Sequence, residues 1–459
     1  MTDQRPGLAP TDLAVDHALS RLAEGVRLLL AITPVDVAEE KARFLADGTE
    51  PEFTYREPDT DPAVLTAEIE AIDVDGVEDV TLAHLLRSKR DELRLQAQLL
   101  AQRCTPEFRS TSELLFGGVD DRLREVATAI VSAVPAPVED RAKVGAQAVH
   151  ERAMVEIEAY RQTDPDVEMH SRIRDDVTGV LVEGDSLLIS TDARVDTVRL
   201  DALVHHEVGT HLVTHANGSR QPVTLLSNGF AGYDETQEGL AVLGEIACGG
   251  LTVSRLRQLG GRVLAVDRML AGASFGENHA ALVSEGFSPG GAFTTAMRVH
   301  RAGGLTKDAI YLRGLLELLD HVRDGGELEP FFLGKFRLRD LPLVADLRDR
   351  GLLEPPALRP RHLADEAAAA RIHEAAHADS LLDLAQQVAA AAAKADLQHL
   401  GLDDGADVHA QQLRRPRIAQ MPQPALQHQP LPAVIGFQRI TPVAQNWTQS
   451  SKSARERSR

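Results

Sequence analysis

The feature that most restricts how this chain can fold is a histidine-rich segment, LVHHEVGTHLVTH, at residues 203–215. His206 is followed by Glu207, and His211 comes five residues after His206. The segment is expected to be helical, and positions five apart on an ideal helix differ by about 500°, which is about 140° away from a common face. A π-bulge adds one residue to a turn, and Gly209 would make that distortion inexpensive. The two imidazoles can therefore meet only if the helix loosens between them.

A histidine–glutamate pair followed by a second histidine is typical of zinc hydrolases, although their usual spacing is H-E-x-x-H. The alternative is an ordinary helix with several histidines, because His205 and His215 stand in the same segment. His211 and His215 also form a regular i, i+4 pair. The existence of a third ligand must decide between the two interpretations.

A candidate for that ligand is a carboxylate on the next expected helix. Zinc in hydrolases takes three protein ligands and leaves one position open for water. The helix that begins DETQEGLA carries Glu238, and the residues that follow it, Gly239 to Ala241, are an unusually apolar setting for a solvated charge. Glu245, seven residues later on nearly the same face, could be an alternative ligand or an acceptor behind a ligand histidine. The other interpretation is that both glutamates are surface charges.

The apolar periodicity predicts a mainly α protein with a small β element (α+β). We expect a helical N-terminal region (1–165), a domain that contains the histidine segment (166–398), and a tail (399–459) whose Gln, Pro, Ser and Arg content predicts disorder. Residues 177–190 predict a β-hairpin, and a helix capped by Asp196 or Thr197 should run to about residue 216. Further helices are expected at 12–33, 81–104, 120–133, 140–162, 235–250, 255–270, 276–285, 291–301, 307–324 and 363–397.

Charge and cysteine content restrict the partners and the compartment. A net charge of −20 argues against nucleic acid or an anionic membrane as the main partner. Two cysteines, Cys104 and Cys248, do not make a disulfide framework and favour a reducing compartment. The N-terminal residues MTDQRPGLAP lack the apolar stretch of a signal peptide. A cytoplasmic protein is the expectation.

At HEVGTH followed by GYDETQEGLA, the sequence resembles the QEGLA-motif proteins, whose bacterial members are often labelled flavohemoglobin expression-modulating. Their eukaryotic relatives are the microtubule-associated tyrosine carboxypeptidases, zinc enzymes that remove the C-terminal tyrosine of tubulin. The resemblance runs from about residue 15 to 375 and includes ELRLQAQLLAQRCTPEFRSTSELLFG and RVHRAGGLTKDAIYLRGLLE. It implies a helical zinc-metallopeptidase core in 166–398, with an H-E-x-x-x-H helix.

Carried over residue by residue, the resemblance implies one Zn²⁺ per chain. His206, His211 and Glu238 would be its ligands, Glu207 the catalytic base, and Glu245 a secondary residue. The late histidine is then part of the family's pattern.

An enzyme that removes a C-terminal residue must also recognise a free carboxylate, which arginine and lysine do best. The stretch RVHRAGGLTKDAIYLRG is cationic, and we expect some of its residues to bind the substrate carboxylate, with Tyr311 donating to the oxyanion or the substrate. The alternative is a cationic surface stretch that balances nearby acids. The candidates for substrate binding are Arg298, Arg301, Lys307, Tyr311 and Arg313, with Tyr233 and Asn228 from the loop before the Glu238 helix.

Two smaller expectations concern the surroundings of this site. Asp234 is expected to cap the Glu238 helix, with Gln237 completing a pair that resembles a capping box. An exposed edge strand of the 177–190 hairpin could bind an extended peptide, or the hairpin could simply cover the zinc helix.

These patterns favour a cytoplasmic zinc-dependent metallopeptidase, a carboxypeptidase that hydrolyses the C-terminal peptide bond of a protein or peptide tail. A zinc-bound water activated by Glu207 would attack that bond. The competing hypothesis is a non-catalytic metal-binding regulatory protein that affects gene expression. Glu207 favours the enzyme, because a purely structural metal site has no use for a base beside its ligand.

Overall fold

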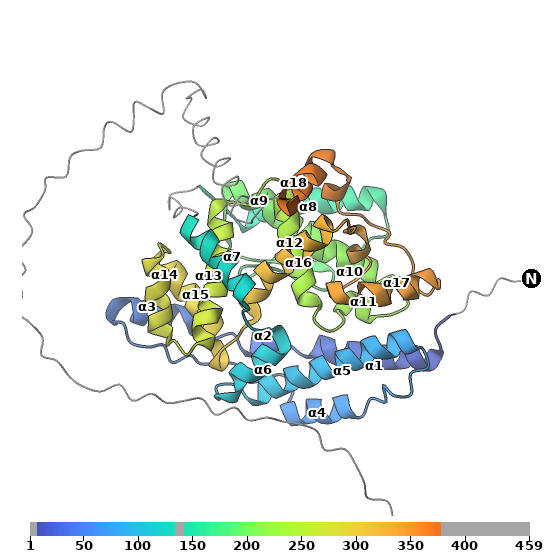
Figure 1. Cartoon of the computed structure of the whole chain (residues 1–459), viewed down its shortest axis with the longest axis horizontal. Helices are drawn as coiled ribbons and strands as arrows, with labels where there is room; N and C mark the ends of the chain where they lie inside the picture. The colour runs from blue at the N-terminus through green and yellow to red at the C-terminus, as the bar shows by residue number, and fades with distance from the viewer. Residues whose placement is uncertain (1–6, 134–141, 378–459) are drawn as a thin grey trace, which may run out of the picture. The chain divides into compact units, whose positions relative to one another are not determined.

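Helices form the N-terminal part of the chain in the computed structural model, which describes residues 7–133 and 142–377 (Figure 1). The helix expected at 12–33 is interrupted: α1 ends at Gly25, and Val26 has an extended backbone with φ −83° and ψ 93°. Glycine is a poor helix former, and the break lets a second, short helix bury Leu28 and Ala31 in the core. The N-terminal helices are α1 (Pro10–Gly25), α2 (Leu28–Ala31), α3 (Val37–Asp47), α4 (Pro62–Glu70), α5 (Val80–Ala101), α6 (Glu107–Phe116) and α7 (Asp121–Ala133).

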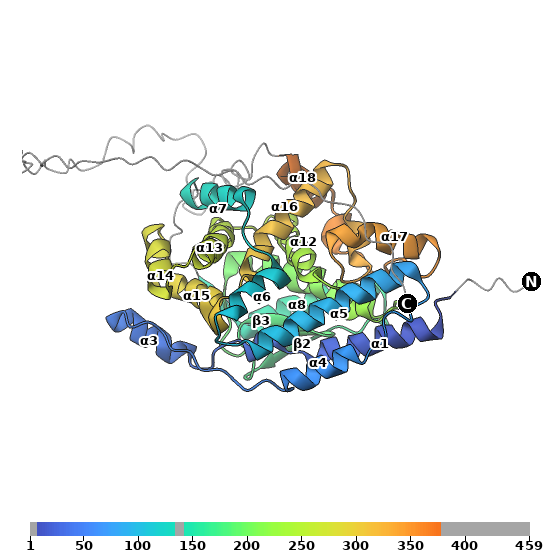
Figure 2. The same cartoon turned by 60° about the horizontal axis from the view of Figure 1, so that its bottom comes forward.

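The longest helix of this part, α5, organises the others. Its buried face is aliphatic, with Leu82, Leu86 and Leu93 at helical spacing. α1 and α4 lie along it (Figure 2). The side chain of Asp79 caps its first turn by accepting from the backbone N–H of Leu82.

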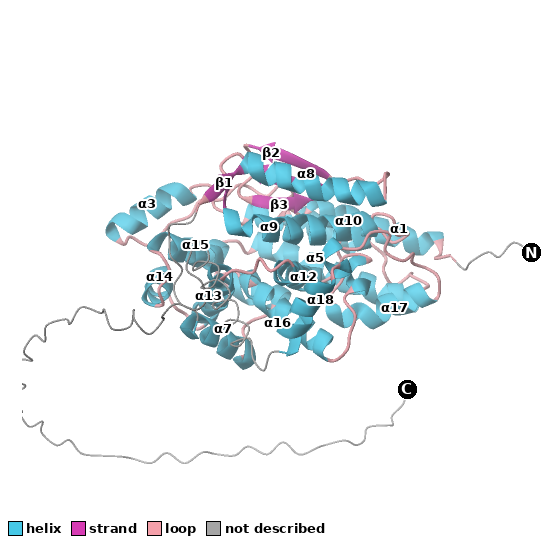
Figure 3. Cartoon of the chain, turned by 90° about the horizontal axis from the view of Figure 1, so that it is seen from above, coloured by secondary structure: helices cyan, strands magenta, loops and turns pink. Residues whose placement is uncertain are grey.

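The strands form two small sheets that lie beside α8 (Figure 3). The expected hairpin is confirmed: β3 (Val180–Glu183) and β4 (Ser186–Ser190) are antiparallel, and Gly184 turns between them with φ 58°. β2 (His170–Arg174) runs parallel to β4 on its other side, so β4 is central and wholly buried. β1 (Lys143–Gly145) pairs antiparallel with β5 (Arg194–Asp196).

The segment from α8 to α12 carries the histidine motif. The expected cap at its start is wrong, because neither Asp196 nor Thr197 accepts from the helix. The Thr197 hydroxyl instead donates to the carbonyl of Ala142, and Asp196 is taken up in β5. The elements are α8 (Ala146–Thr163), η1 (Thr197–Arg199), α9 (Leu200–His206), the π-helix η2 (Glu207–Leu212), α10 (Val213–Gly218), α11 (Leu225–Asn228) and α12 (Tyr233–Ala247).

Two glycines bring α12 and α16 into backbone contact near the middle of the molecule (Figure 1). A Cβ atom on Gly239 would lie 2.5 Å from the carbonyl carbon of Gly314, and one on Gly314 would lie 2.0 Å from the carbonyl oxygen of Glu235. Any larger residue would push the helices apart. This close approach holds Glu238 against the chain segment that leads into α16.

The remaining described elements are helical: α13 packs on α7, and α16 and α18 pack on α12. A small aromatic cluster of Phe44, Phe275 and Phe293 joins α3 to α14 and α15. The bounds are α13 (Val253–Leu270), α14 (Phe275–Ser284), α15 (Pro289–His300), η3 (Arg301–Gly303), η4 (Lys307–Ala309), α16 (Ile310–Arg323), η5 (Glu329–Phe332), η6 (Leu338–Asp340), α17 (Leu341–Asp349), η7 (Arg361–Ala364) and α18 (Glu366–His377).

The mainly α class with a small β element is confirmed. The described residues pack around one main aliphatic core and belong to a single unit, within which the division at residue 165 stays a prediction. The tail at 399–459 and the end of the helix expected at 363–397 lie outside the described residues. Among the helices that are described, none combines the length and the apolar character that crossing a membrane requires.

Candidate metal centre

The helix that carries the histidine motif widens between His206 and His211, as their five-residue spacing requires. α9 continues without a break into η2, a π-helical turn over Glu207–Leu212, and then into α10. The π turn confirms the expected distortion and returns His211 to the face of His206. Their rings lie 5.2 Å apart, centroid to centroid, at an interplanar angle of 80°.

Gly209 does less in this turn than the sequence suggested. Its φ is not positive, and a Cβ there would meet the Nδ1 atoms of His205 and His362 at ordinary distances of 3.4 and 3.8 Å. Thr210 makes a more specific contribution, because its buried hydroxyl donates to the carbonyl of His205, five residues back, at 3.2 Å. A threonine that supports the widened turn is a signal that sequence reasoning missed.

α12 brings Glu238 to the two imidazoles. Its Oε2 lies 3.6 Å from Nε2 of His206 and 3.9 Å from Nε2 of His211, and the three candidate ligand atoms are all within 4.8 Å of one another. Ligands about 2.0–2.2 Å from one tetrahedral zinc ion stand roughly 3.3–3.6 Å apart, so small side-chain rotations suffice for them to share an ion.

Acceptors behind both histidines turn the Nε2 atoms toward Glu238. Nδ1 of His206 lies 3.0 Å from Oε1 of Glu245, and Nδ1 of His211 lies 3.5 Å from Oε1 of Gln237. An imidazole that donates from Nδ1 presents the lone pair of Nε2 to a metal. Glu245 therefore lies on the far side of His206 from Glu238, and Gln237 contacts His211 and is not part of a capping box.

Two arginines hold Glu245 in this position. The fully buried carboxylate accepts from Arg199 at 2.8 Å and from Nε of Arg255 at 3.2 Å. Burial raises the pKa of Glu245, but Arg255, the hydrogen bond with His206 and the charge of Arg199 outweigh it and leave the pKa below its usual value. Neither arginine was predicted to belong to the site, because both lie on other helical segments.

The protonation states within the cluster follow from burial and neighbouring charge. Burial lowers the pKa of His211 to about 4, so its imidazole is neutral, as a ligand must be. For His206, burial acts in the same direction, but hydrogen bonds with Glu238 and Glu245 prevail and raise the pKa to about 9. Burial alone would raise the pKa of Glu238, but its two histidine neighbours hold that pKa well below the usual range.

Glu207 is a buried carboxyl group beside the triad. Only 8% of the residue is exposed, and within the described chain it has neither a hydrogen-bond nor an ion-pair partner. Burial raises its pKa to about 7, and the charges of Glu238 and Glu245 act in the same direction. A group of this kind is suited to accept and return a proton at neutral pH.

The other two histidines of the motif do not join the triad. His205 packs edge-on against His362 at 5.9 Å between ring centroids. Nδ1 of His215 lies 3.3 Å from the carbonyl oxygen of Ser227. The regular i, i+4 pair of His211 and His215 therefore does not form a site of its own.

Two of the expected substrate-binding arginines are fully engaged with the protein. Arg298 makes a bidentate pair with Asp308, at 2.6 and 2.7 Å. Arg313 contacts the carboxylate of Glu235 and the carbonyl oxygens of Phe116 and Gly118, and so ties α16 to the loop after α6. Their substrate-binding role stays a prediction, which would require these contacts to break.

Lys307 and Tyr311, like Arg298, lie within reach of the charge of Glu238. Nζ of Lys307 donates to Oδ1 of Asp234 at 2.6 Å. The expected cap by Asp234 is therefore wrong: α12 begins after Gly232 without a side-chain cap, and the carboxylate is used for an ion pair.

The two substrate-binding candidates from the loop before α12, Asn228 and Tyr233, contact different parts of the protein. Asn228 donates to Ser20 and Glu24 of α1, at 2.6 Å each, and so joins the loop to the N-terminal helices. Tyr233 is half-buried beside the ammonium group of Lys335, 5.9 Å from its ring centroid. The charge of Asp234, together with burial, raises the pKa of the Tyr233 hydroxyl well above its usual value.

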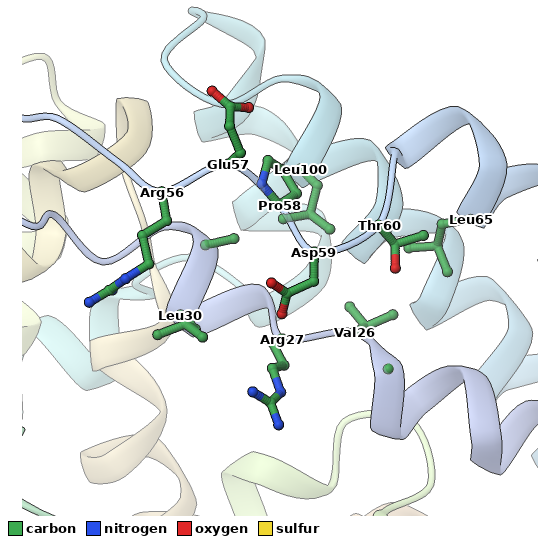
Figure 4. Close-up of a pocket in the computed structure, with 12 residues that line it drawn as sticks. Val26, Arg27, Leu30, Arg56, Glu57, Pro58, Asp59, Thr60, Leu65 and Leu100 are labelled. Carbon is green, nitrogen blue, oxygen red and sulfur yellow. The ribbon is translucent and has the colours of Figure 1, made fainter. Parts of the chain in front are cut away.

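A separate small cavity lies away from these residues. It is lined by the α1–α2 break, by the loop at residues 56–60 before α4, and by α5 (Figure 4). Its volume of about 20 Å³ has room for about one water molecule. None of the side chains around it belongs to the triad or to the cationic candidates. They include Val26, Arg27, Leu30, Arg56, Asp59, Leu65 and Leu100.

Comparison with known proteins agrees with the motif. A family model described as microtubule-associated tyrosine carboxypeptidase matches residues 42–414, which include the N-terminal helices from α4 onward as well as η2 and α12. No curated protein matches the chain closely enough to be named as a relative. Because the match extends over most of its length, the chain belongs to the microtubule-associated tyrosine carboxypeptidase family.

Proposed function

We propose that the protein is a zinc-dependent metallopeptidase of the carboxypeptidase type, which hydrolyses the C-terminal peptide bond of a protein or peptide tail. The observation that carries the proposal is the convergence of His206, His211 and Glu238 within 4.8 Å across a π-helical turn. Membership of a carboxypeptidase family supports the reaction type. Within that family we assign the chain to the QEGLA-motif proteins, on the motif at residues 237–241.

The residues fit a zinc ion by their chemistry. Two imidazoles and one carboxylate are a donor set of catalytic zinc sites, which keep a fourth position open. The acceptors behind His206 and His211 fix the ring nitrogens that would face the ion. His206, His211 and Glu238 would hold the metal, which when bound supplies a Lewis acid and lowers the pKa of its water toward 7.

Glu207 would move the proton. Glu207 follows His206 directly in the sequence. A carboxylate that is buried without a partner costs free energy unless it binds a ligand, a water or a substrate. It would accept the proton of the attacking water and donate it to the departing amine, which is the role of a general base that then acts as an acid. A site used only to hold structure would not need such a group.

The substrate would reach the site as an extended tail. β3 is an edge strand, and both β3 and β4 pack beside η2. An edge strand can pair with a peptide through main-chain hydrogen bonds. The family name specifies tyrosine and microtubules; for this chain we propose only the class of substrate, a protein or peptide with a free C-terminus.

Metal content and hydrolysis, measured on the same preparations, test the proposal. We expect wild type to bind one zinc ion and to shorten peptides from a panel with varied C-termini, as detected by mass spectrometry. Glu207→Gln should keep the metal and lose hydrolysis, whereas Glu238→Ala should lose the metal. Arg268→Gln, on the surface of α13, serves as a control that should change neither.

The result that would overturn the proposal is a wild type that holds zinc and cleaves no peptide of the panel. That outcome would favour the non-catalytic regulatory alternative. A wild type that binds no zinc at saturating concentration would contradict both the proposed enzyme and the regulatory alternative, because each requires a bound metal.

A further inference from the structure

Arg262, Arg298 and Arg301 gather around the carboxylate of Asp308. Arg262 and Arg298 both face the carboxylate of Asp308, Arg262 at 3.8 Å and Arg298 as a bidentate pair. The charge of Arg301 acts on the same carboxylate, and its own hydrogen bond is to the hydroxyl of Thr33. Three guanidinium groups thus share the carboxylate of Asp308, and the charge of Glu238 acts on Arg298 as well. Among the described residues, these positive groups outnumber the carboxylates that act on them.

Arg262 is the member of this group that has no hydrogen bond. Within residues 7–133 and 142–377, none of its guanidinium nitrogens has a hydrogen-bond partner, and its side chain is 12% exposed. Burial, together with the like charge of Arg298, lowers its pKa to about 10, so it remains charged at neutral pH. A guanidinium group that is enclosed, reachable and without hydrogen bonds is costly to maintain, and an incoming anion would offset that cost.

Tyr311 lies beside Arg262 and links it to the metal centre. The guanidinium carbon of Arg262 is 5.1 Å from the centroid of the Tyr311 ring, and that of Arg255 is 5.9 Å from it. Arg255 in turn contacts Glu245, the acceptor behind His206. In the described chain the Tyr311 hydroxyl also lacks a hydrogen-bond partner. Burial raises the pKa of this hydroxyl, and the charge of Glu238 raises it further.

We propose that Arg262, with the Tyr311 hydroxyl, binds the free C-terminal carboxylate of the peptide substrate. The inference rests on the proposed function and names the feature of the substrate that this side of the site recognises. The planar fork of arginine matches a carboxylate with two parallel hydrogen bonds, and a phenol can donate a third. A terminal carboxylate would also bring one negative charge to three guanidinium groups that share the carboxylate of Asp308.

The position of Arg262 in the fold supports the assignment. It lies seven residues after Arg255 on α13, which places both side chains on the same face of the helix. α13 packs against α15, η4 and α16, the elements that carry Arg298, Asp308 and Tyr311 (Figure 1). These contacts hold the guanidinium group of Arg262 in place before the substrate binds, so few side chains lose conformational freedom on binding.

A pair of peptides of one sequence, one with a free C-terminal acid and one with a C-terminal amide, tests the inference on the zinc-loaded protein. We expect wild type to prefer the acid, and Arg262→Gln to raise the KM for the acid by about 10- to 100-fold, the range of a lost charged hydrogen-bonded contact. The amide should be cleaved as slowly by the variant as by wild type. Tyr311→Phe should raise KM for the acid by about tenfold or less, because it removes one neutral donor.

Arg268→Gln is the matched control, because it removes an arginine from the same helix at a place where the side chain pairs with Glu285. It should leave the acid-to-amide ratio unchanged. Arg262→Lys keeps the charge and loses the fork, so it should fall between wild type and Arg262→Gln. It also provides a folded variant if Arg262→Gln does not accumulate.

The outcomes separate this inference from the proposed function. If wild type cleaves the acid peptide but the Arg262 variants keep the full preference for acid over amide, the carboxylate is bound elsewhere and only this inference fails. If wild type cleaves amide and acid equally well, the inference also fails and the enzyme is not a carboxypeptidase. If wild type cleaves neither peptide, the proposed function fails first.

Discussion

Replacing Glu245 by glutamine would decide between the two roles that the sequence left open for this residue, metal ligand or acceptor behind a ligand. Glu245 is fully buried, and its oxygens accept from His206, Arg199 and Arg255 at 2.8–3.2 Å. Glu238 meets His206 at Nε2, whereas Glu245 meets it at Nδ1. We therefore expect Glu245→Gln to bind zinc in the same one-to-one ratio, but more weakly.

The magnitudes follow from these contacts. Loss of the acceptor behind a metal-bound histidine typically lowers metal affinity about 10- to 100-fold, which is roughly 1.4 to 2.7 kcal/mol. The substitution also leaves the buried Arg255 and the partly buried Arg199 without their shared counter-charge, and removing one partner of a buried pair costs about 3–5 kcal/mol. Because glutamine keeps one acceptor oxygen, we expect a loss of about 3 kcal/mol in the free energy of unfolding of the metal-free protein.

Two measurements keep the effects apart. Urea unfolding in the presence of a chelator reports the stability of the metal-free protein, and competition with a chromophoric chelator reports zinc affinity. Glu285→Gln is the control: it breaks the pair with Arg268, in which both side chains are one-quarter exposed, and should cost less than about 1 kcal/mol with zinc affinity unchanged. If Glu245→Gln binds no zinc while Glu238→Gln still does, Glu245 is the ligand and the assignment is refuted.

Gly314→Ala would place a methyl group 2.0 Å from a backbone oxygen of α12; we expect a loss of at least about 1–3 kcal/mol in urea unfolding, and a stability equal to wild type would contradict the close approach. Burial lowers the pKa of His300 to about 4, so its stability contribution is complete above about pH 6.5 and roughly 3 kcal/mol is lost as pH falls to about 4. His300→Gln, which keeps an acceptor for Asn278, should flatten that dependence, and parallel pH profiles would argue against it. Since a π turn arises from one extra residue in an α-helix, deletion of Gly209 should restore a regular helix with the two histidines four apart; a folded deletion variant that binds no zinc would refute this account of the spacing.

Local sequence features made His206, His211 and Glu238 candidate metal ligands, and the resemblance to the QEGLA-motif proteins favoured Glu238 over Glu245. His206 and His211 lie in one helix, so the geometry of a helix alone required a widened turn between them. Glu238 follows after a single loop, and its apolar neighbours marked it as unusual. The family match covers all three residues, and the metal itself remains a proposal.

Ion pairs that depend on tertiary contacts could not be predicted from the sequence. Asp234 has the position of a helix cap, but Lys307 lies within 2.6 Å and takes its carboxylate. Arg298 looked available because it stands in a cationic stretch, yet Asp308 from the same stretch folds back onto it. Arg262 was overlooked because it lies on another helix, 36 residues before Arg298.

Charge is distributed unequally across the candidate site, and this asymmetry favours a substrate that ends at the site over one that passes through it. Carboxylates gather around the metal ligands: Arg199 and Arg255 balance Glu245, and a divalent cation would balance Glu207 and Glu238. Beyond Tyr311, guanidinium groups outnumber carboxylates among the described residues, and Arg262, Arg298 and Arg301 share Asp308. A peptide C-terminus has an electrophilic carbonyl and a carboxylate one residue apart, so it can meet both environments at once. An internal segment of a peptide carries no backbone charge and would leave the guanidinium groups unbalanced, at a cost that only a terminal carboxylate removes.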